Sequence, residues 1–374
     1  MSSRREVLIG AGAAALGWNV CIPVSAAEAL SSDVTARDAP MTITADGAVV
    51  SLIVHGRQTR GTLDTGASHT VVDAAFAREV GLLAQEQVAV GGVFGGVDGA
   101  MSHQTHLQIG GRRVAISPIV VDLSASGLGV PVIVGADFFR GGPVQFDFGA
   151  SVLRMLGPIP AGERIDGYEV PLRRSSRAIL QLSVQVDGSP VLLGLDTGSQ
   201  TALTLPATAG GHRRESTWIT ADITGWRVHN VRSASVTIGT TELTQVPASV
   251  IDEAAEGLMG LPALSRFKIT LDMADERIWF APLPSVSEPF PRDRLGLAMM
   301  PGDRRLEVVH VAANSPALAA GFVVGDQIVK VGGEAVTDET KSRLQRTGRG
   351  TVGTVVKLET ASGAVRSVEL ADYF

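Results

Sequence analysis

The 374-residue chain is poor in several residue types, and each scarcity excludes a class of protein. Its single cysteine, Cys21, excludes a disulfide framework, a thiolate zinc cluster and an iron–sulfur site. Charged residues make up 19% of the chain and hydrophobic residues 45%, which excludes a disordered protein. Lys and Arg number 32 against 38 Asp and Glu, and they form no basic block. Nucleic acid is therefore not an expected partner, because neutralising phosphates needs clustered cations.

Glycine and proline, in contrast, are plentiful, with 43 and 18 residues. No periodic polar segment is long enough for a coiled coil, so the composition favours a β-rich protein with many turns. The length allows two or three domains with a sizeable buried core.

The first 27 residues have the order of a secretory signal. Arg4 and Arg5 precede an apolar run over Val7–Val24, and small residues follow up to Ala27. The paired arginines resemble the twin-arginine export signal, which carries folded proteins. We therefore expect a signal peptide over residues 1–27 and a periplasmic or secreted protein. The alternative is an N-terminal membrane anchor that is not cleaved, since the apolar run is almost long enough to span a bilayer.

An internal repeat is the strongest signal in the sequence. Leu63-Asp64-Thr65-Gly66 recurs as Leu195-Asp196-Thr197-Gly198, 132 residues later. Gly56 and Gly188 stand eight residues before the two aspartates, each after a run of alternating apolar residues. Alternation, a glycine turn and a second apolar run predict a β-hairpin whose second strand ends at the aspartate.

The repeat continues downstream of the two aspartates. Val132-Ile133-Val134-Gly135 corresponds to Gly257-Leu258-Met259-Gly260, and Asp147 and Asp272 stand twelve residues after the last glycine of each run. Landmarks in the same order with nearly constant spacing predict a duplicated β unit. The expected segments are a linker at 28–40, a first lobe at 41–158 and a second lobe at 165–283.

Two aspartates on such turns have a chemical use. The glycine after each aspartate lets the turn pack closely against another backbone. If the two units pack about a pseudo-twofold axis, the carboxylates meet and share one proton, because like charges a few ångström apart do not ionise together easily. The ionised carboxylate then activates a water and the protonated one polarises a scissile carbonyl. This chemistry needs no metal, so no cofactor is expected.

The motifs Asp64-Thr65-Gly66-Ala67-Ser68 and Asp196-Thr197-Gly198-Ser199 resemble those of the pepsin-like and retropepsin-like aspartic proteases. The resemblance covers roughly residues 41–283 and implies a mainly β fold with two β-barrel lobes. It implies that Asp64 and Asp196 are catalytic and that Thr65 and Thr197 lock the two turns together by hydrogen bonds. It also implies that the Ser199 hydroxyl supports the second carboxylate, whereas Ala67 gives no such support.

A flap in each lobe is a further implication of the resemblance, meaning a glycine-bearing hairpin that closes over the substrate. The candidate flap residues are Gly91, Gly92, Phe94, Gly95 and Gly96 in the first lobe and Gly225 and Trp226 in the second. The alternative is that each segment is an ordinary β-hairpin loop.

The histidines carry less information than the aspartates. His103 and His106 have no third ligand at a sensible spacing, so we expect them on the solvent face of a strand and not at a metal ion. His69 follows Asp64 by five residues. We expect it at the surface, with tuning of the carboxylate pair as the alternative.

In the last part of the chain Ser315-Pro316, Ala320-Gly321 and Gly325-Asp326 stand between apolar segments, and this pattern resembles a bacterial PDZ domain of the kind attached to periplasmic proteases. Residues 284–293 are proline-rich and predict a linker that few contacts cross, followed by the domain at 294–374. Ser315-Pro316 and Gly325-Asp326 stand where a helix start and a turn before an apolar strand are expected. The resemblance rests on this order of caps, turns and apolar strands.

The PDZ resemblance implies a site for a C-terminal peptide ligand. The backbone amides of Leu295, Gly296 and Leu297 would capture the peptide carboxylate while the peptide adds as a β-strand beside a helix at Asp338–Arg346. The alternative is a packing or dimerisation module.

The leading hypothesis is an exported aspartic endopeptidase that hydrolyses peptides or proteins as a monomer, with a PDZ domain that recognises substrates or partners or regulates the enzyme. A second hypothesis is a peptide-binding scaffold whose protease-like lobes are inert. A third is an enzyme that needs a partner chain. Cleavage of a random peptide library separates the first from the second, and activity at low concentration with a mass measurement separates the first from the third.

Overall fold

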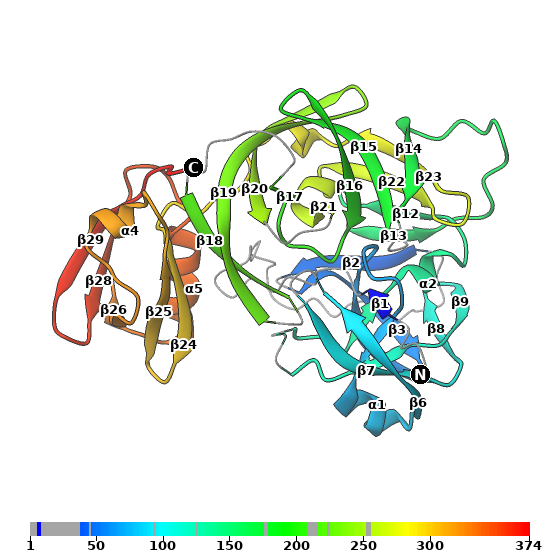
Figure 1. The fold of residues 1–374 in the computed structure, drawn as a ribbon, viewed down its shortest axis with the longest axis horizontal. Helices are drawn as coiled ribbons and strands as arrows, with labels where there is room; N and C mark the ends of the chain where they lie inside the picture. Colours follow the sequence, from blue (N-terminus) through cyan, green and yellow to red (C-terminus); the bar gives the residue numbers. More distant parts are fainter. Residues whose placement is uncertain are drawn as a thin grey trace.

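The computed structural model describes residues 6–8, 38–44, 46–92, 95–124, 126, 128–175, 179–207, 216–222, 225–251 and 256–374. The expected signal peptide lies outside these residues except for the strand β1 (Glu6–Leu8), and the expected linker lies outside them up to residue 37. Figure 1 shows two β-rich lobes, one above the other, and a smaller domain beside the second lobe. Within the described residues, no helix is both long and apolar enough to cross a membrane.

The first lobe consists mostly of strands, as its alternating sequence predicts. The hairpin that leads to Asp64 turns at His55 and Gly56, whose φ angles of 50° and 77° lie in the left-handed region. In chain order the lobe contains β2 (Asp38–Thr44), β3 (Gly47–Val54), β4 (Arg57–Leu63), β5 (Val71–Asp73), α1 (Ala74–Val80), β6 (Ala84–Gly91), β7 (Gly96–Ser102), β8 (Thr105–Ile109), β9 (Arg112–Ile116), β10 (Ile119–Val121), β11 (Val132–Val134), α2 (Ala136–Phe139), β12 (Val144–Asp147) and β13 (Val152–Met155).

The second lobe repeats this plan, with fewer elements among its described residues. Its hairpin to Asp196 turns at Asp187 and Gly188, with φ angles of 49° and 77°, so the two copies share even the turn conformation. In chain order the lobe contains β14 (Tyr168–Arg174), β15 (Leu180–Val186), β16 (Ser189–Asp196), β17 (Leu203–Pro206), β18 (Ser216–Asp222), β19 (Gly225–Ile238), β20 (Thr241–Ile251), β21 (Gly257–Gly260), α3 (Leu261–Leu264), β22 (Phe267–Asp272) and β23 (Arg277–Pro282).

A short strand crosses beside each aspartate turn. In the first lobe β11 lies between β4, to which it is parallel, and β5, to which it is antiparallel. In the second lobe β21 lies in the same way between β16 and β17. Every residue of β11 and β21 is buried, which explains why both segments are uninterrupted apolar runs. The duplication in the sequence is therefore a duplication of the fold.

One antiparallel sheet joins the two lobes. β12 pairs with β22, with Val144 opposite Leu271, and the sheet runs β2-β13-β12-β22-β23-β14. Phe146 on β12, Phe267 on β22 and Phe280 on β23 are buried in a hydrophobic core that is continuous between the lobes. The shared core and sheet fix the two aspartate turns relative to each other.

The C-terminal domain has a separate core around Phe322 and Leu358 and a sheet of its own in the order β24-β25-β26-β28-β29, with β27 on β26. The Ser315 hydroxyl accepts the N–H of Leu318 at 3.2 Å and caps the first helix, as the sequence predicts. The elements are β24 (Leu297–Gly302), β25 (Arg305–Val311), α4 (Pro316–Ala319), β26 (Gln327–Val331), β27 (Glu334–Ala335), α5 (Asp338–Thr347), β28 (Val355–Thr360) and β29 (Val365–Glu369).

The proline-rich segment before this domain is packed against the second lobe. Its 3-10 helix η1 (Pro284–Ser287) and the residues after it accept hydrogen bonds from Arg266, whose guanidinium donates to the carbonyl oxygens of Ser285 and Pro289. The same guanidinium lies 4.5 Å from the ring centre of Phe290, which is buried. The structure thus differs from the expected linker with few contacts, because an arginine of the lobe binds its free carbonyl groups.

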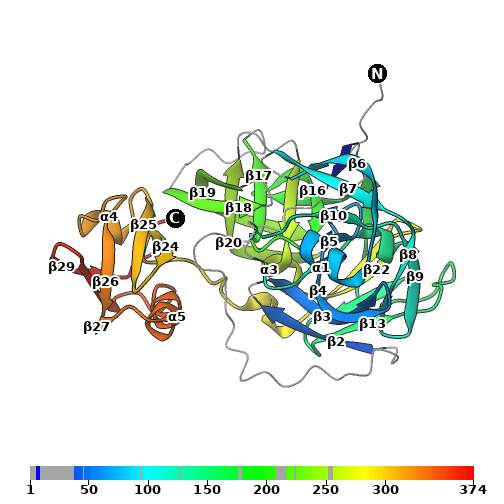
Figure 2. The same cartoon turned by 90° about the horizontal axis from the view of Figure 1, so that it is seen from below.

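The C-terminal domain also contacts the second lobe directly at the start of β18. The Ser216 hydroxyl donates to the Ala313 carbonyl, and the Ala313 N–H donates to the Thr217 hydroxyl at 3.2 Å. The Thr217 hydroxyl lies 3.2 Å from Nε2 of His310, and the Trp218 ring meets the His310 ring edge-on. Figures 1 and 2 both show β18 on the side of the lobe that faces the C-terminal domain.

We expect Gly135→Ala, at the end of β11, to destabilise the protein. A Cβ at this position would lie 2.3 Å from the carbonyl carbon of His69, and a backbone atom cannot rotate away. The free energy of unfolding should fall by about 1–3 kcal/mol, the usual effect of overpacking. Gly157→Ala is the matched control, because a Cβ there would meet no atom within 4 Å. Urea unfolding measures both variants, and equal stability would contradict the close crossing at β11.

Candidate active site

Asp64 and Asp196 occupy equivalent positions in the two lobes. Asp64 directly follows β4, Asp196 is the last residue of β16, and both side chains are fully buried. Oδ1 of Asp64 accepts the backbone N–H groups of Gly66 (2.9 Å) and Ala67 (3.0 Å). Oδ1 of Asp196 accepts the two equivalent N–H groups of its own turn, both at 3.0 Å. Each turn therefore holds one oxygen of its carboxylate and leaves Oδ2 unbound by the turn.

The glycine of each turn packs against the carboxylate of the other lobe. A Cβ at Gly66 would lie 2.8 Å from Cγ of Asp196, and a Cβ at Gly198 would lie 2.4 Å from Cγ of Asp64. Real Cβ atoms do not approach other atoms so closely, so any side chain at these positions would push the turns apart. The glycines are thus required by the meeting of the two carboxylates, which places all four residues in one site.

Two threonines join the turns by four hydrogen bonds. The Thr65 hydroxyl donates to the Leu195 carbonyl (2.8 Å) and accepts the Thr197 N–H (3.1 Å). The Thr197 hydroxyl donates to the Leu63 carbonyl (2.8 Å) and accepts the Thr65 N–H (3.1 Å). Each hydroxyl is satisfied as both donor and acceptor in a buried site, so the lock is symmetric and fully bonded.

The second oxygens of the two carboxylates are buried without a donor group. Oδ2 of Asp64 and Oδ2 of Asp196 have no hydrogen-bond partner among the described residues. Two ionised carboxylates that lie close together in a buried site repel each other, so the site favours a single proton between them. Burial raises the pKa of Asp64 to about 6, against the lowering effect of hydrogen bonds from Asp196 and the turn. Burial, and then the charge of Asp64, raise the pKa of Asp196 well above its ordinary value. The two carboxylates therefore titrate as one unit, and the raised pKa values belong to the pair.

The structure corrects the expected role of Ser199. Its hydroxyl lies 3.4 Å from the Thr201 carbonyl and 3.3 Å from the Thr201 N–H, so the side chain stabilises the chain after the turn. Ser199 supports Asp196 through its backbone N–H, as Ala67 supports Asp64. The side chain at this position is not needed for that bond, which explains why the two copies differ there.

A polar network that the sequence analysis missed braces the first turn. Asp137, on α2, accepts the N–H (3.0 Å) and the hydroxyl (2.7 Å) of Thr70, and the Thr70 hydroxyl accepts the Gly135 N–H (3.1 Å). The equivalent residues of the second copy are Ala202 and Pro262, which cannot form these bonds. Aligning the two copies residue by residue would have exposed this difference.

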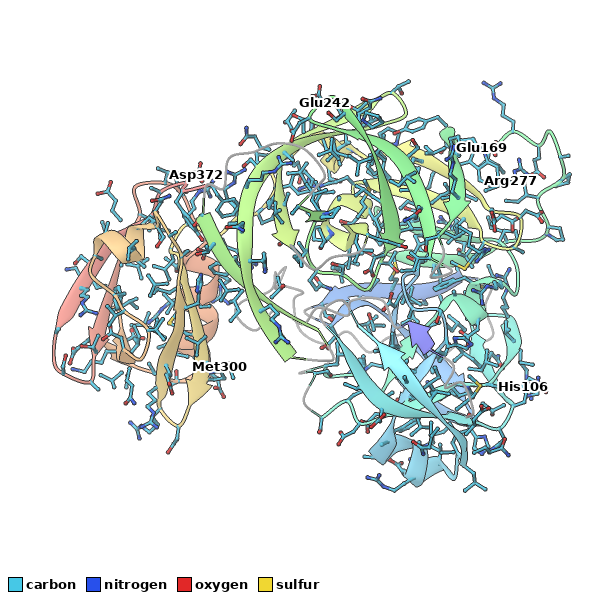
Figure 3. The ribbon with its side chains drawn as sticks, viewed as in Figure 1. His106, Glu169, Glu242, Arg277, Met300 and Asp372 are labelled. Carbon is cyan, nitrogen blue, oxygen red and sulfur yellow. The ribbon has the colours of Figure 1, made fainter. Side chains whose placement is uncertain are left out.

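The histidines lie away from the carboxylate pair. His69 is partly buried, with Nδ1 3.1 Å from the Ser68 hydroxyl, and burial lowers its pKa while Asp137 acts against that. His103 Nδ1 lies 3.2 Å from the Leu83 carbonyl, and His106 is exposed at the rim of the first lobe, where Figure 3 labels it. No group of three or more potential metal ligands occurs in the part of the chain that the structure describes.

Both expected flap segments lie in hairpins. β6 and β7 form the first, which closes with a hydrogen bond from the Gly92 N–H to the Gly95 carbonyl (2.7 Å). Gly91 and Gly96 form its last pair, and Phe94 lies outside the described residues. β18 and β19 form the second hairpin, with Asp222 opposite Gly225 and Ala221 opposite Trp226, and only the backbone of Trp226 is described.

The edge of the first hairpin already carries an added strand. β1 pairs in parallel with β6, with Glu6 opposite Ala89, Val7 opposite Val90 and Leu8 opposite Gly91. An extended segment that is remote in the sequence therefore hydrogen-bonds to the strand that leads to the flap tip. This edge of β6 has the geometry to bind an extended peptide backbone.

The loop at Leu295, Gly296 and Leu297 does not present three free amides as the resemblance implies. The Gly296 N–H donates to Oδ2 of Asp293 at 2.5 Å. Leu297 begins β24 and pairs with Val311. The chain's own carboxylate thus occupies one of the three expected donors, and the sequence analysis did not single out Asp293.

Comparison with family models gives two matches. Residues 50–141 match the model described as "gag-polyprotein putative aspartyl protease", and residues 307–361 match the model described as a PDZ domain. The first range includes the Asp64 turn and β11, and the second begins within β25. A search of the curated proteins found no match.

We expect Asp196→Asn to raise the stability at neutral pH. Because the folded pKa of Asp196 is raised, the unfolded chain loses this proton at lower pH, and the free energy of unfolding falls as the pH rises above about 4. Asparagine has no proton to lose, so the variant should be more stable than the unmodified protein at pH 7 and no more stable near pH 3.

Urea unfolding at the two pH values measures this gain. Asp303→Asn, at an exposed aspartate in the turn after β24, serves as the control and should gain nothing at either pH. A gain of the same size at pH 3 and pH 7 would contradict a proton buried between the carboxylates.

Proposed function

We propose that this chain, which contains a retropepsin-like aspartyl protease domain and a C-terminal PDZ domain, is an endopeptidase that uses the Asp64–Asp196 pair to hydrolyse peptide bonds with water. The observation that carries the proposal is the buried pair itself. Two carboxylates held by reciprocal hydrogen bonds and sharing one proton form a combined general base and general acid.

The proposed mechanism gives Asp64 the role of base and Asp196 the role of acid. Asp64, the ionised partner, accepts a proton from a water whose oxygen attacks the carbonyl carbon of the substrate. Asp196 donates its proton to the carbonyl oxygen, and a neutral diol forms. When the C–N bond breaks, the leaving nitrogen takes the proton from Asp64, and Asp196 regains a proton from a hydroxyl of the diol. The pair is then singly protonated again, and no covalent intermediate forms.

One chain supplies the complete pair. Both carboxylates, both glycines and both threonines of the site belong to the two lobes of the same molecule, joined by the sheet through β12 and β22. This arrangement supports hydrolysis by a monomer over the hypothesis of an enzyme that needs a partner chain. The raised pKa values support an active site over an inert scaffold, since keeping a buried proton costs stability at neutral pH.

Substrates of this proposed enzyme are extended peptide segments. The edge of β6 next to the flap tip already binds the backbone of Glu6–Leu8, which supports recognition of a substrate as an added strand. We further propose export through the signal at residues 1–27, on the strength of Arg4 and Arg5 before the apolar run. Cleavage after Ala27 would remove β1 and leave this edge to a substrate.

The PDZ domain is positioned to regulate the enzyme. It contacts Ser216, Thr217 and Trp218 at the start of β18, and β18 is one strand of the second flap hairpin. A movement of the PDZ domain can therefore displace β18 and, with it, the second flap hairpin. This contact favours regulation through the flap over a domain that only tethers substrates.

The decisive test of the proposed function is substitution of the pair. Asp64→Asn and Asp196→Asn should each lower kcat by about a thousandfold or more, because the two carboxylates act as a unit. In the unmodified enzyme the rate should rise with pH through about 6, where Asp64 ionises, and fall when Asp196 loses its proton. Steady-state assays on a peptide from a random library measure both. Substantial activity in either folded variant, or a rate without the rise near pH 6, would contradict the mechanism.

The double variant Ser216→Ala/Thr217→Val should change the cleavage of short peptides severalfold. It removes both hydroxyls that bind the PDZ domain and leaves the buried pair untouched. Thr237→Val, on β19 of the same hairpin, is the matched control. Measurement of kcat and KM on a short peptide decides the matter, and unchanged constants would show that the domain contact does not act on the flap.

A further inference from the structure

Two buried histidines meet where the C-terminal domain contacts the second lobe. His229 lies on β19 of the lobe and His310 on β25 of the domain, and their exposed fractions are 7% and 8%. Trp218 on β18 pairs with His229, and its ring meets the His310 ring edge-on. Residues directly opposite each other on paired strands point to the same face of a sheet. His229 therefore points to the face of the hairpin that the C-terminal domain covers (Figures 1 and 2).

The hydrogen bonds at His310 fit a neutral ring. The Thr217 hydroxyl accepts the Ala313 N–H at 3.2 Å and lies 3.2 Å from Nε2 of His310. The hydroxyl can donate its own proton to Nε2 only while that nitrogen is unprotonated, because an imidazolium is a donor at both nitrogens. Protonation of His310 would therefore take away the acceptor of the Thr217 hydroxyl, in the contact that joins the domain to the lobe.

His229 has no acceptor for a second proton. Its Nδ1 lies 3.4 Å from the Thr220 hydroxyl, and its Nε2 is buried with no hydrogen-bond partner among the described residues. A charged His229 would therefore bury an N–H without an acceptor. Burial lowers the pKa of His229 to about 4, while the backbone of Arg227 acts against this and the charge of His310 adds to it. Burial also lowers the pKa of His310.

The charged groups around the two rings do not offset this burial. Arg227 is exposed on β19, on the same side of the strand as His229. The cavity beside Trp218 has five charged residues in its lining, Arg266, Glu288, Arg292, Asp293 and Arg349. Among the described residues, the one charge that shifts the pKa of His229 is that of His310, and none shifts the pKa of His310. Burial raises the pKa of Asp293 to about 6, so acid favours its packed state and opposes the histidines.

We propose that His229 and His310 form a pH-sensitive contact, which holds the C-terminal domain on the second flap hairpin while both rings are neutral and releases it when they gain protons. The contact itself does not depend on the activity of the Asp64–Asp196 pair. Its effect on cleavage rests on the proposed function, because the hairpin covers a substrate only in an active enzyme.

Acid favours the released state. A released His229 regains the ordinary pKa of about 6.5, whereas the docked ring has a pKa of about 4. The ratio of docked to released molecules is therefore constant above about pH 6.5 and falls from there towards pH 4, where the docked ring also takes a proton. From His229 alone, the ratio falls about 70-fold between pH 7.5 and pH 4.5. His310 acts in the same direction, because its pKa is also lowered.

Hydrogen exchange at Ala313 measures this ratio, because its N–H bonds the Thr217 hydroxyl across the contact. The full chain carries Asp196→Asn, so that the result does not depend on the proposed activity. Exchange is followed by mass spectrometry at pH 7.5 and pH 4.5, and each rate is divided by that of a free amide at the same pH. The protection of the Ala313 N–H should fall by about 70-fold or more.

The neighbouring Ala312 N–H is the matched control. It donates to the Gly296 carbonyl inside the domain at 2.9 Å, so its protection should not follow the release. A fall of less than about tenfold at Ala313 would overturn the proposal. An equal fall at Ala312 would also overturn it, because the domain would then be unfolding, and so would an equal fall along β19, because the hairpin would then be opening.

The double variant His229→Asn/His310→Gln tests whether the two rings cause the change. Both new side chains stay neutral and keep a polar group near Thr220 and Thr217, so the protection of Ala313 should change less than about threefold between the two pH values. His106→Gln, at an exposed histidine of the first lobe, is the control and should keep the full fall. A full fall in the double variant would overturn the role of the histidines. The measurement without these substitutions decides the proposal even if the double variant fails to fold.

Discussion

The reciprocal hydrogen bonds between Thr65 and Thr197 are the constraint on which the site depends. Each hydroxyl bonds the backbone of the opposite lobe, so neither aspartate turn can move without the other. These hydrogen bonds bring Gly66 and Gly198 against the carboxylates of the opposite lobes. Because each glycine packs on the opposite carboxylate, both carboxylates are buried. A shared proton is the physical response to that burial, since two ionised carboxylates cannot be accommodated without water. The proposed chemistry thus follows from hydrogen bonds whose direct effect is only to hold the two aspartate turns together.

The two lobes share a fold but differ in the residues that stabilise their aspartate turns. The first turn is braced by Thr70 and Asp137, while the second copy has Ala202 and Pro262 in their places and relies on the Ser199 hydroxyl. The environment of the pair is therefore asymmetric, although burial raises the pKa of both carboxylates. A single chain can fix which carboxylate holds the proton, because its two halves can differ in sequence.

The third domain is integrated with the second lobe. Arg266 binds the carbonyl groups of the proline-rich segment, and β18 bonds to the turn at Ala313. This domain contacts a strand of the second flap hairpin, so a change in the domain can act on that hairpin. Asp293 accepts the Gly296 N–H, a bond that composition and motif do not reveal, since an aspartate three residues before a glycine is an ordinary turn residue in sequence.

The sequence by itself determined the duplicated β architecture, the pairing of Asp64 with Asp196 and the kind of third domain. These follow from local patterns, such as alternating apolar residues, glycine turns and a repeated motif. Such patterns predict the same local structure whatever the surrounding fold. Only the tertiary structure decided that both carboxylates are fully buried, that Ser199 acts through its backbone and that Asp293 bonds the Gly296 N–H. It also decided that the proline-rich segment is packed and that β18 bonds to the PDZ domain. Each of these depends on burial or on the geometry of a hydrogen bond. Burial and geometry are set by contacts between residues that are far apart in the sequence, so local patterns do not predict them.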